Sequence, residues 1–473
     1  MRTHCTQQHL HFQPLSRRKV VADFSAGPVS SDGGALLLRE VDERTGIVAR
    51  LAQCFTDFRY ADQVEHTVLD LLRQRIYGLC LGYEDINDHD RLRHDPLLAT
   101  AVGKADPTGT TRRGNHQGVA LAGKSTLNRL ELAPPEASYH SRYKKVVAAH
   151  DELESFFVDE FIDAQGDAEI PRLVLDFDAS DIQLHGKQEG RFYHGYYGHY
   201  CYLPLYVFCG EHLLLAKVRE ANIDGCLGTV EVLTWLVPKL RARWPNAEIV
   251  LRGDGGFARE RIFSWCEEND VQYVIGFARN PRLLERIQSE LAAAKELSQT
   301  SGRPARLFAE LTYRTQKTWS RSRRVVAKAE QILGKANPRF IVTSYREDEY
   351  AGATLYEQQY CARGEMENRI KEAQLDLFGT RTSCTKKRAN QLRVWFSAAA
   401  YVLMTEFRRT ALTDTVLARA QSKTIRVRLL KVGARVRISA RRVYVQFSSS
   451  FPLREVFEQA LANIAALPLA APT

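Results

Sequence analysis

The feature that most constrains the fold lies between residues 172 and 278, where apolar strands and amphipathic helices follow one another in a definite order. Three strand patterns come first, with Gly210 as the turn between the last two, and a helix, a strand, a helix and a strand follow. This order predicts a mixed α/β sheet with helices on its faces. The predicted strands are 172–178, 200–209, 212–220, 247–254 and 271–278, and the predicted helices are 229–244 and 258–269.

The same order is found in the ribonuclease-H-like core, so we expect an α/β protein with a ribonuclease-H-like mixed-sheet core, a β insertion and a helical N-terminal domain. Residues 1–165 carry apolar residues mostly at helical spacing and are expected to form that N-terminal domain, with a role in DNA binding. Residues 166–410 form the core, and alternating strands at about 300–350 form the insertion. Residues 411–473 are read as a basic segment of strands and a final helix.

One short stretch suggests a different class of protein. The residues "GVALAGKST" (118–126) match the phosphate-loop pattern through Gly118, Gly123, Lys124 and Ser125. That loop needs a buried strand leading into it, and residues 103–118 are polar and rich in turns. We therefore interpret Ser125 or Thr126 as the N-cap of a helix and expect no ATP.

Two aspartates stand at the ends of predicted strands. Asp178 closes the first strand, and Asp254 closes the fourth within "LRGDGGF". Strand ends of such sheets face a shared crevice, and the glycines beside Asp254 would let a phosphate backbone approach. Asp176 shares a strand face with Asp178 and is a second candidate. Two loop aspartates that cap helices would give the same pattern.

A third acid, Glu367, lies on a predicted helix within "YCARGEMENRIKE", with Arg363 one turn before it and Lys371 one turn after. This spacing fits a solvated helix face with ion pairs. It also fits a site in which Asp, Asp and Glu hold hard divalent cations for phosphoryl transfer. Composition alone does not choose between the two.

Long strings of the sequence resemble those of DDE insertion-sequence transposases, specifically the insertion-sequence thirteen-eighty family, a relative of the insertion-sequence four family. The resemblance covers nearly the whole chain and includes "FSAGPVSSDGGALLLRE", "DFDASDIQLHGKQEGRFYHGYYGHYCYLPLYVFCG", "LRGDGGFARE" and "KRANQLRVWFSAAAYVLM". It implies that the catalytic, metal-binding acids are Asp178, Asp254 and Glu367. The third belongs to a signature that falls on Tyr360, Arg363 and Glu367.

The chain departs from the related four family at one position. That family has a lysine seven residues after its glutamate, where this chain has Gln374, so Lys371 is a candidate for the same role. The string around His185, Gln188 and Glu189 is typical of the family, and we assign it only to a loop near the site.

The resemblance implies a transposase that binds two Mg²⁺ ions, with Mn²⁺ as a substitute, cuts DNA at transposon ends and transfers the freed 3′-OH into target DNA. Its expected partners are the terminal inverted repeats, target DNA and a second copy of the chain in the DNA complex. Two alternatives stay open: a catalytically inactive, transposase-derived DNA-binding protein, and a ribonuclease-H-like nuclease without strand transfer.

Charge and composition agree with a DNA partner inside the cell. The chain carries 66 Lys and Arg against 56 Asp and Glu, for a formal charge of +10. We expect no membrane span and no signal peptide, and a cytoplasmic, nucleoid-associated protein. Basic residues of the insertion and of a predicted strand at 424–430 join those of the signature as expected DNA contacts, namely Arg323, Arg324, Arg426, Arg428, Tyr360, Arg363 and Lys371.

Overall fold

The computed structural model describes residues 9–332 and 334–468, and the chain divides into two compact units. The first contains the described parts of Met1–Val48, Arg59–Leu130 and Glu406–Thr473. The second contains Ala49–Phe58 and Glu131–Thr405. Within the described residues, no helix is both long enough and apolar enough to span a membrane.

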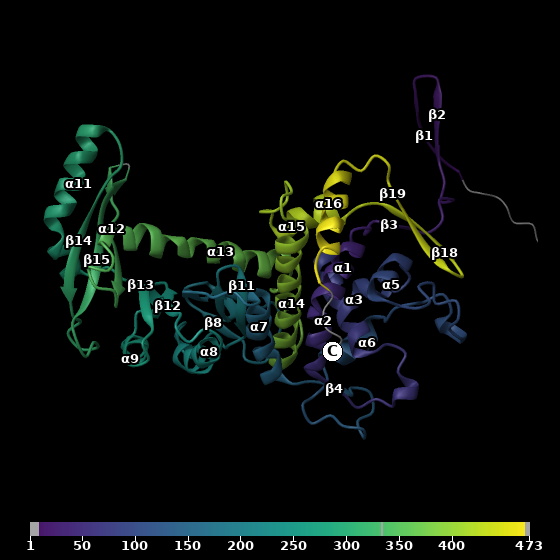
Figure 1. Cartoon of the computed structure of the whole chain (residues 1–473), viewed down its shortest axis with the longest axis horizontal. Coiled ribbons are helices and arrows are strands. Elements are labelled where there is room, and N and C mark those ends of the chain that lie inside the picture. The colour runs from purple at the N-terminus through teal and green to yellow at the C-terminus, as the bar shows by residue number, and fades with distance from the viewer. Residues whose placement is uncertain (1–8, 333, 469–473) are drawn as a thin grey trace, which may run out of the picture. The chain divides into compact units, whose positions relative to one another are not determined.

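A large mixed sheet forms the centre of the second unit (Figure 1). In the described part of the chain it has nine strands in the order β11-β10-β6-β12-β13-β17-β15-β14, with β16 beside β15. The strands are β6 (Arg172–Ala179), β10 (Leu205–Cys209), β11 (His212–Lys217), β12 (Glu248–Gly253), β13 (Gln272–Phe277), β14 (Ala305–Tyr313), β15 (Arg323–Ile332), β16 (Lys335–Ala336) and β17 (Arg339–Thr343).

The predicted strands and helices of residues 172–278 are confirmed. β10 pairs antiparallel with both β11 and β6, whereas β6, β12 and β13 run parallel. Helices α8 (Thr229–Arg243) and α9 (Glu260–Glu268) connect the parallel strands. The predicted strand at 200–209 is divided into β9 (His199–Tyr202) and β10, because Pro204 between them has no N–H to donate to a ladder.

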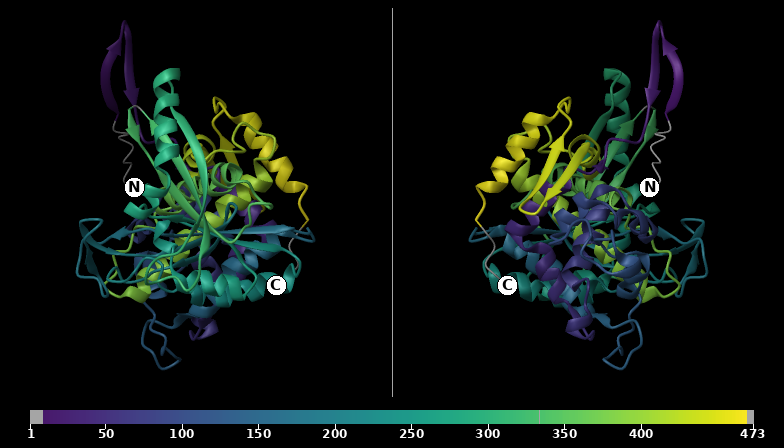
Figure 2. Two further views of the ribbon diagram at one scale, coloured as in Figure 1. Left: turned by 90° about the vertical axis from the view of Figure 1, so that its left-hand side faces the viewer. Right: turned by 90° about the vertical axis from the view of Figure 1, so that its right-hand side faces the viewer.

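The β insertion at 300–350 is also present, and it continues the central sheet. β17 pairs antiparallel with β13, and β15 pairs with both β17 and β14. Helix α10 (Pro281–Arg286) and helix α11 (Gln288–Ser301) precede these strands. α11 lies along β14 and β15 (Figures 1 and 2).

Each face of the central sheet has its own apolar core. Leu175, Phe177 and Leu251 pack with residues of α8, α9 and α7 (His150–Gln165) in one cluster. Val250 and Val274 lie on the other face and pack with Leu355 and Tyr356. Because side chains alternate along a strand, Asp176 and Asp178 share this second face with Val174.

A helical run from residue 352 to residue 376 covers the second face, and it contains the predicted helix of Glu367. It is not a uniform α-helix, because π-helical turns flank its centre. Such turns add a residue to a helical turn and are frequent at functional sites. The run comprises α12 (Gly352–Thr354), the π-helical segments Leu355–Tyr360 and Glu372–Asp376, the 3-10 turn Cys361–Arg363, and α13 (Gly364–Lys371).

The remaining elements of the second unit are short apart from α14 (Lys387–Ala411), which continues into the first unit. β4 (Phe55–Asp57) pairs with β5 (Val146–Ala148), and α7 begins after β5, at His150. β7 (Ile182–Gln183) and β8 (Phe192–His194) pair with β9 in a small sheet beside the end of β6.

The first unit is largely helical. Its stretch 35–53 is divided into two helices at Gly46, whose φ of 73° ends α1. The unit also contains strands that the sequence pattern did not indicate, the hairpin of β1 (Leu10–Leu15) and β2 (Arg18–Ala22). The helices of its N-terminal part are α1 (Ala35–Thr45), α2 (Ile47–Gln53, continuing into the second unit), α3 (Val68–Leu81), α4 (His89–Leu92), α5 (Pro96–Val102) and α6 (Lys124–Glu131).

The C-terminal segment belongs to this first unit. β18 (Ala434–Ser439) pairs with β19 (Arg442–Phe447) and with β3 (Val29–Ser30), and α16 (Arg454–Ala465) follows. The strand predicted at 424–430 is wrong: α15 (Ser422–Ile425) and a π-helical segment (Arg426–Leu430) occupy it. Ile425 and Leu429 are both buried, which is helical spacing.

The stretch that resembles a phosphate loop is part of this unit, and no described residue from Gly118 to Gly123 lies in a strand. The following helix, α6, begins at Lys124, so the predicted N-cap at Ser125 or Thr126 is wrong. The Lys124 backbone N–H instead donates to Asp90 Oδ1 at 3.0 Å, and Lys124 Nζ lies 3.2 Å from Asp90 Oδ2. The lysine of the phosphate-loop pattern, Lys124, is therefore paired with the Asp90 carboxylate.

Gly276 on β13 provides a test of how tightly the sheet packs against the helical run. A Cβ at this position would lie 2.5 Å from the Tyr360 hydroxyl and 3.0 Å from the Gly255 backbone nitrogen. We expect Gly276→Ala to lower the free energy of unfolding by about 1–3 kcal/mol, because backbone has to move. Urea denaturation measures the change. Gly364→Ala is the matched control, since nothing lies within 4 Å of its added Cβ, and equal losses in both variants would contradict the packing described.

Candidate active site

Asp178 and Asp254 meet at the carboxyl ends of two adjacent parallel strands. In the register of β6 with β12, Phe177 is opposite Gly253, so the next residues on the two strands are Asp178 and Asp254. Asp254 starts a 3-10 turn (Gly255–Phe257), and its Oδ1 accepts the Gly256 N–H at 2.9 Å. Asp254 therefore caps a turn, and it also faces the end of β6. A capping role and a role in the candidate site are compatible for this residue.

Arg363 connects two of the predicted acids. Its Nη2 donates to Asp178 Oδ1 at 2.5 Å, and its Nη1 lies 3.5 Å from Glu367 Oε1. The Arg363 side chain is only 12% exposed, and within residues 9–332 and 334–468 its Nε has no hydrogen-bond partner. Burial acts to lower the pKa of Arg363, but Asp178 and Asp254 outweigh it and raise that pKa. The structure thus gathers three carboxylates around one cation.

Ionisation of the Asp178 carboxyl is costly because it is buried beside other acids. Burial raises the pKa of Asp178 to about 6, Arg363 opposes this rise, and the charges of Asp254 and Glu367 add to it. A buried carboxyl beside two further acids is a site that gains from a bound cation.

Asp176, the second candidate for the first acid, has another role. Its side chain is 1% exposed and accepts from Arg252 Nε at 2.5 Å and from Arg252 Nη2 at 2.7 Å. Arg252 Nη1 also donates to the Gln359 carbonyl at 2.6 Å, so this ion pair ties the helical run to the sheet. Asp176 is thus occupied by a structural partner, and Asp178 is the acid that faces the other two.

Tyr360 lies between the helical run and the turn after β12. Its hydroxyl packs over Gly276, close to Gly255 and Asp254. The pKa of Tyr360 is raised, mainly by burial, so its phenol stays neutral. A neutral, buried hydroxyl suits a positioning role.

The residues after Glu367 differ in their exposure. Gln374 is buried, and its Nε2 donates to the Tyr206 hydroxyl at 3.3 Å and to the Asp181 carbonyl at 3.4 Å. Lys371 is exposed, and in the described part of the chain it makes no ion pair. Asp181, just beyond β6, pairs with His199 at 2.7 Å. Lys371 is therefore the cation of this helix that is open to a ligand.

The loop string that contains His185, Gln188 and Glu189 lies beside β7. Gln188 accepts the Gly186 N–H at 3.0 Å and donates to the Thr382 carbonyl at 3.1 Å. Glu189 accepts the Lys387 N–H at 3.2 Å. These contacts hold the loop against the start of α14.

The side chains of the candidate site carry the kind of oxygen atom that binds a metal ion, but they are not close enough together to hold one as they stand. In the described residues, no three His, Cys, Asp or Glu side chains are close enough together to hold one as they stand. The guanidinium of Arg363 instead supplies the positive charge between Asp178 and Glu367. The available donors are carboxylate oxygens, which Mg²⁺ and Mn²⁺ prefer, so the chemistry of the residues fits a hard divalent cation.

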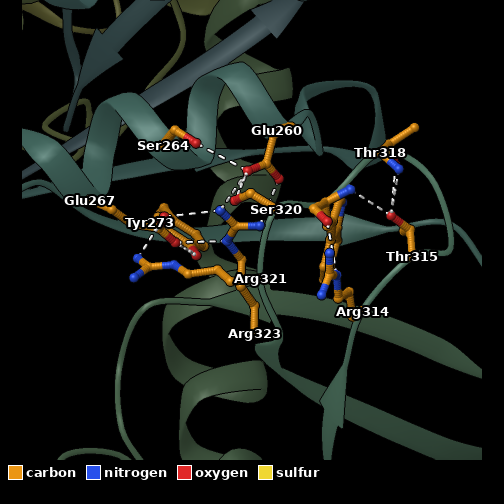
Figure 3. A network of polar contacts seen from close by, with 11 residues as sticks. Glu260, Ser264, Glu267, Tyr273, Arg314, Thr315, Thr318, Ser320, Arg321 and Arg323 are labelled. Atoms are coloured by element: carbon orange, nitrogen blue, oxygen red, sulfur yellow. Dashed lines mark hydrogen bonds and ion pairs between the residues drawn. The ribbon is translucent and has the colours of Figure 1, made fainter.

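Two predicted DNA contacts in the insertion are engaged within the protein, and Figure 3 shows the network around one of them, Arg323. The Arg323 side chain is 2% exposed and lies between Glu260, at 2.8 Å, and Glu267, at 2.7 Å. Arg321 and Tyr273 also bond to Glu267 in this network. Arg324 pairs with Glu310 at 2.8 Å and donates to backbone carbonyls. Both guanidiniums therefore face carboxylates of the protein itself.

The other two predicted contacts lie on the helical segment that replaces the expected strand. Arg426 is buried and donates through Nε to the Cys80 carbonyl at 2.7 Å, so it holds the end of α3. Arg428 is exposed. Residues 424–430 are helical, so they do not form the expected basic face of a strand. One of the two arginines is buried and the other is exposed.

Sequence reasoning missed the partner of Asp176 and an aromatic hairpin near Asp254. Arg252 lies two residues before Asp254 on β12, and this placement on the same strand face was the available signal. The hairpin was visible as "FYHGYYGHY", a run of rings with few aliphatic residues.

Comparison with known proteins identifies the family. The family model described as transposase DDE domain group 1 matches residues 12–469, and the chain belongs to this family. No curated protein matches the sequence. A solved structure titled the cryo-EM structure of piggyBac transposase synaptic complex with hairpin DNA is similar over 93% of this chain and 86% of that chain, with 12% identity and a TM-score of 0.40.

The two aspartates of β6 should respond differently to neutralisation. Asp176→Asn leaves the buried Arg252 charge unpaired, so we expect a loss of about 3–5 kcal/mol in the free energy of unfolding. Asp178→Asn removes the cost of a buried charge and leaves Arg363 with Glu367 as a partner, so we expect a change within about 1 kcal/mol at pH 7. Denaturant unfolding of the metal-free protein measures both. A larger loss for Asp178→Asn than for Asp176→Asn would reverse the assignment of the two residues.

Proposed function

We propose that this chain is a DDE transposase that cuts DNA at transposon ends and joins the freed 3′-OH to target DNA, within a ribonuclease-H-like core. The strand order β11-β10-β6-β12-β13, with the first two antiparallel and the last three parallel, supports that core. The observation that carries the proposal is the gathering of Asp178, Asp254 and Glu367 about Arg363 at the ends of β6 and β12.

The three carboxylates are the residues that would hold two Mg²⁺ ions, or Mn²⁺ in their place. When bound, the ions supply activation of the attacking oxygen and stabilisation of the leaving oxygen in phosphoryl transfer. The protein contributes the placement of these carboxylates on strand ends and on a helix that Arg252 ties to the sheet. Rigid placement of this kind is what in-line displacement at a phosphate requires.

Basic residues of the same helical run serve the DNA phosphates in this proposal. Lys371 is exposed one turn beyond Glu367, and Arg363 already lies beside the carboxylates. Their cations would neutralise the phosphates that flank the scissile bond. Tyr360 would hold the turn of Asp254 in place with its neutral hydroxyl.

Cleavage of DNA tests the proposal. Purified protein is mixed with the DNA that flanks its own coding sequence, with and without Mg²⁺, and nicked and joined products are mapped. We expect Asp254→Ala and Glu367→Ala to reduce cutting roughly a thousandfold or more, as loss of main electrostatic groups does. Glu365→Ala is the matched control, because Glu365 is 71% exposed on the same helix and pairs with Arg369.

Each outcome separates the alternatives. Metal-dependent cutting with joined products supports a transposase, and cutting without joining supports a nuclease. Binding without cutting in the wild type supports the inactive DNA-binding protein. Cutting that survives Asp254→Ala would mean that the acids are wrongly assigned.

A second DNA surface is proposed on the ribbon of β18 and β19. Ala434 and Val436 are buried on one face, and the alternate residues Arg435 and Arg437 are exposed on the other. Arg437 is opposite Tyr444, and Arg442 donates to the Tyr444 hydroxyl at 3.1 Å. A two-stranded ribbon with a basic outer face suits a DNA groove and its phosphates. A second copy of the chain in the DNA complex is part of the same proposal.

If the ribbon binds DNA phosphates, its arginines should contribute to the salt dependence of the affinity for DNA. Removing one arginine that binds a phosphate should reduce the slope of log affinity against log salt concentration by about 1, so Arg435→Ala with Arg437→Ala should lower it by about 2. Fluorescence anisotropy with labelled duplexes at several salt concentrations measures the slope. Arg346→Ala is the control, since this exposed arginine already pairs with Asp348. An unchanged slope in the double variant would remove the ribbon from the DNA interface.

A further inference from the structure

A hairpin rich in aromatic rings stands at the edge of the candidate site. It consists of β8, β9 and the turn between them, residues 192–202, and we call it the aromatic hairpin. Tyr196 is 87% exposed, Tyr193 59% and Tyr200 45%. Large rings so exposed on one short hairpin are typical of a surface that binds another molecule.

The aromatic hairpin is fixed to the strand that carries Asp178. Its β9 pairs with β7, directly after β6, and the Tyr197 hydroxyl lies 3.5 Å from the Ala179 carbonyl, which accepts its hydrogen bond. His199 contacts Asp181 at 2.7 Å. Cys201 and Tyr202, at the base, are fully buried. The rings at the tip therefore keep a defined position relative to the catalytic acids.

A small cavity of about 170 Å³ lies between the aromatic hairpin and Asp254. His194, Tyr196 and Tyr197 line one part of it, and Asp254, Gly256 and Phe257 line another. Pockets for whole small-molecule ligands are larger, roughly 300–1,000 Å³. The cavity has room for one compact group, and a planar group there would contact the rings and lie beside Asp254.

Two carboxylates, Asp254 and Asp224, line the cavity. Asp224, a further lining residue, is paired with Arg259 at 2.9 Å. On the opposite face of the hairpin the Arg191 guanidinium lies 4.6 Å from the centre of the Tyr200 ring. Tyrosine rings stack on bases of any sequence because every base presents a π face.

We propose that Tyr196 stacks on one unpaired nucleobase beside the phosphate that Asp254 serves, while the edge of that base meets Tyr197, whose ring lies at 85° to that of Tyr196. The inference rests on the proposed function and adds a base subsite to it. The opposite face of the hairpin has a separate environment, because Tyr193 and Tyr200 are cross-strand partners, whereas His194 and His199 point to the other side. Tyr193 therefore provides a matched control within the same hairpin.

The test uses the full-length protein without metal, so that no DNA is cut. The probes are two short duplexes, one with a single 2-aminopurine opposite an abasic site and one with the same 2-aminopurine paired to thymine. Anisotropy of an end label gives the affinities, and 2-aminopurine fluorescence reports stacking. We expect about tenfold preference for the unpaired probe with quenched fluorescence, and loss of most of that preference in Tyr196→Ala with Tyr197→Ala. Tyr196→Trp and Tyr193→Ala should keep it.

Three results would overturn the inference. In the first, the double alanine variant retains the wild-type preference. In the second, it loses affinity for both probes alike and its oligomeric state changes in size-exclusion chromatography, which would assign the hairpin to contact with a second copy of the chain. In the third, the wild type binds both probes equally, which leaves the proposed transposase function intact. Failure of the wild type to bind either duplex would instead contradict the proposed function itself.

Discussion

The parallel pairing of β6 with β12 is the constraint on which the candidate site depends. It brings the residues after Phe177 and Gly253 to the same edge of the sheet, so two acids that are far apart in sequence become neighbours. Burial raises the pKa of Asp178, and the charge of the neighbouring Asp254 adds to this cost. Arg363 offsets the cost, since it contacts Asp178 and Glu367 together.

The third acid depends on a different interaction. Glu367 is on a helical run that has no strand register to place it, so its position follows from how that run is held against the sheet. The Asp176–Arg252 pair, through the Gln359 carbonyl, and the close packing of Tyr360 on Gly276 both hold it. A buried ion pair and a close packing contact thus determine where a mostly exposed glutamate stands.

The central strands and the acids at their ends could be predicted because strand spacing and the position of a strand end are local properties of the sequence. The roles of the arginines that bind other groups of the protein could not be predicted in this way. Arg323, Arg324 and Arg426 resemble DNA contacts in sequence, but their partners are Glu260, Glu310 and the Cys80 carbonyl, which lie far away along the chain. The segment 424–430 alternates like a strand, yet its apolar residues are also spaced for a helix, and tertiary packing selected the helix.

The central claim is that Asp178, Asp254 and Glu367 share divalent cations. Its most direct test is a crystal structure of the protein soaked with Mn²⁺, with anomalous scattering to locate the ions. We expect anomalous peaks within about 2.0–2.3 Å of oxygens of these three carboxylates, with the Arg363 guanidinium moved away from Asp178. Peaks bound elsewhere, with the Arg363–Asp178 ion pair intact at saturating Mn²⁺, would contradict it.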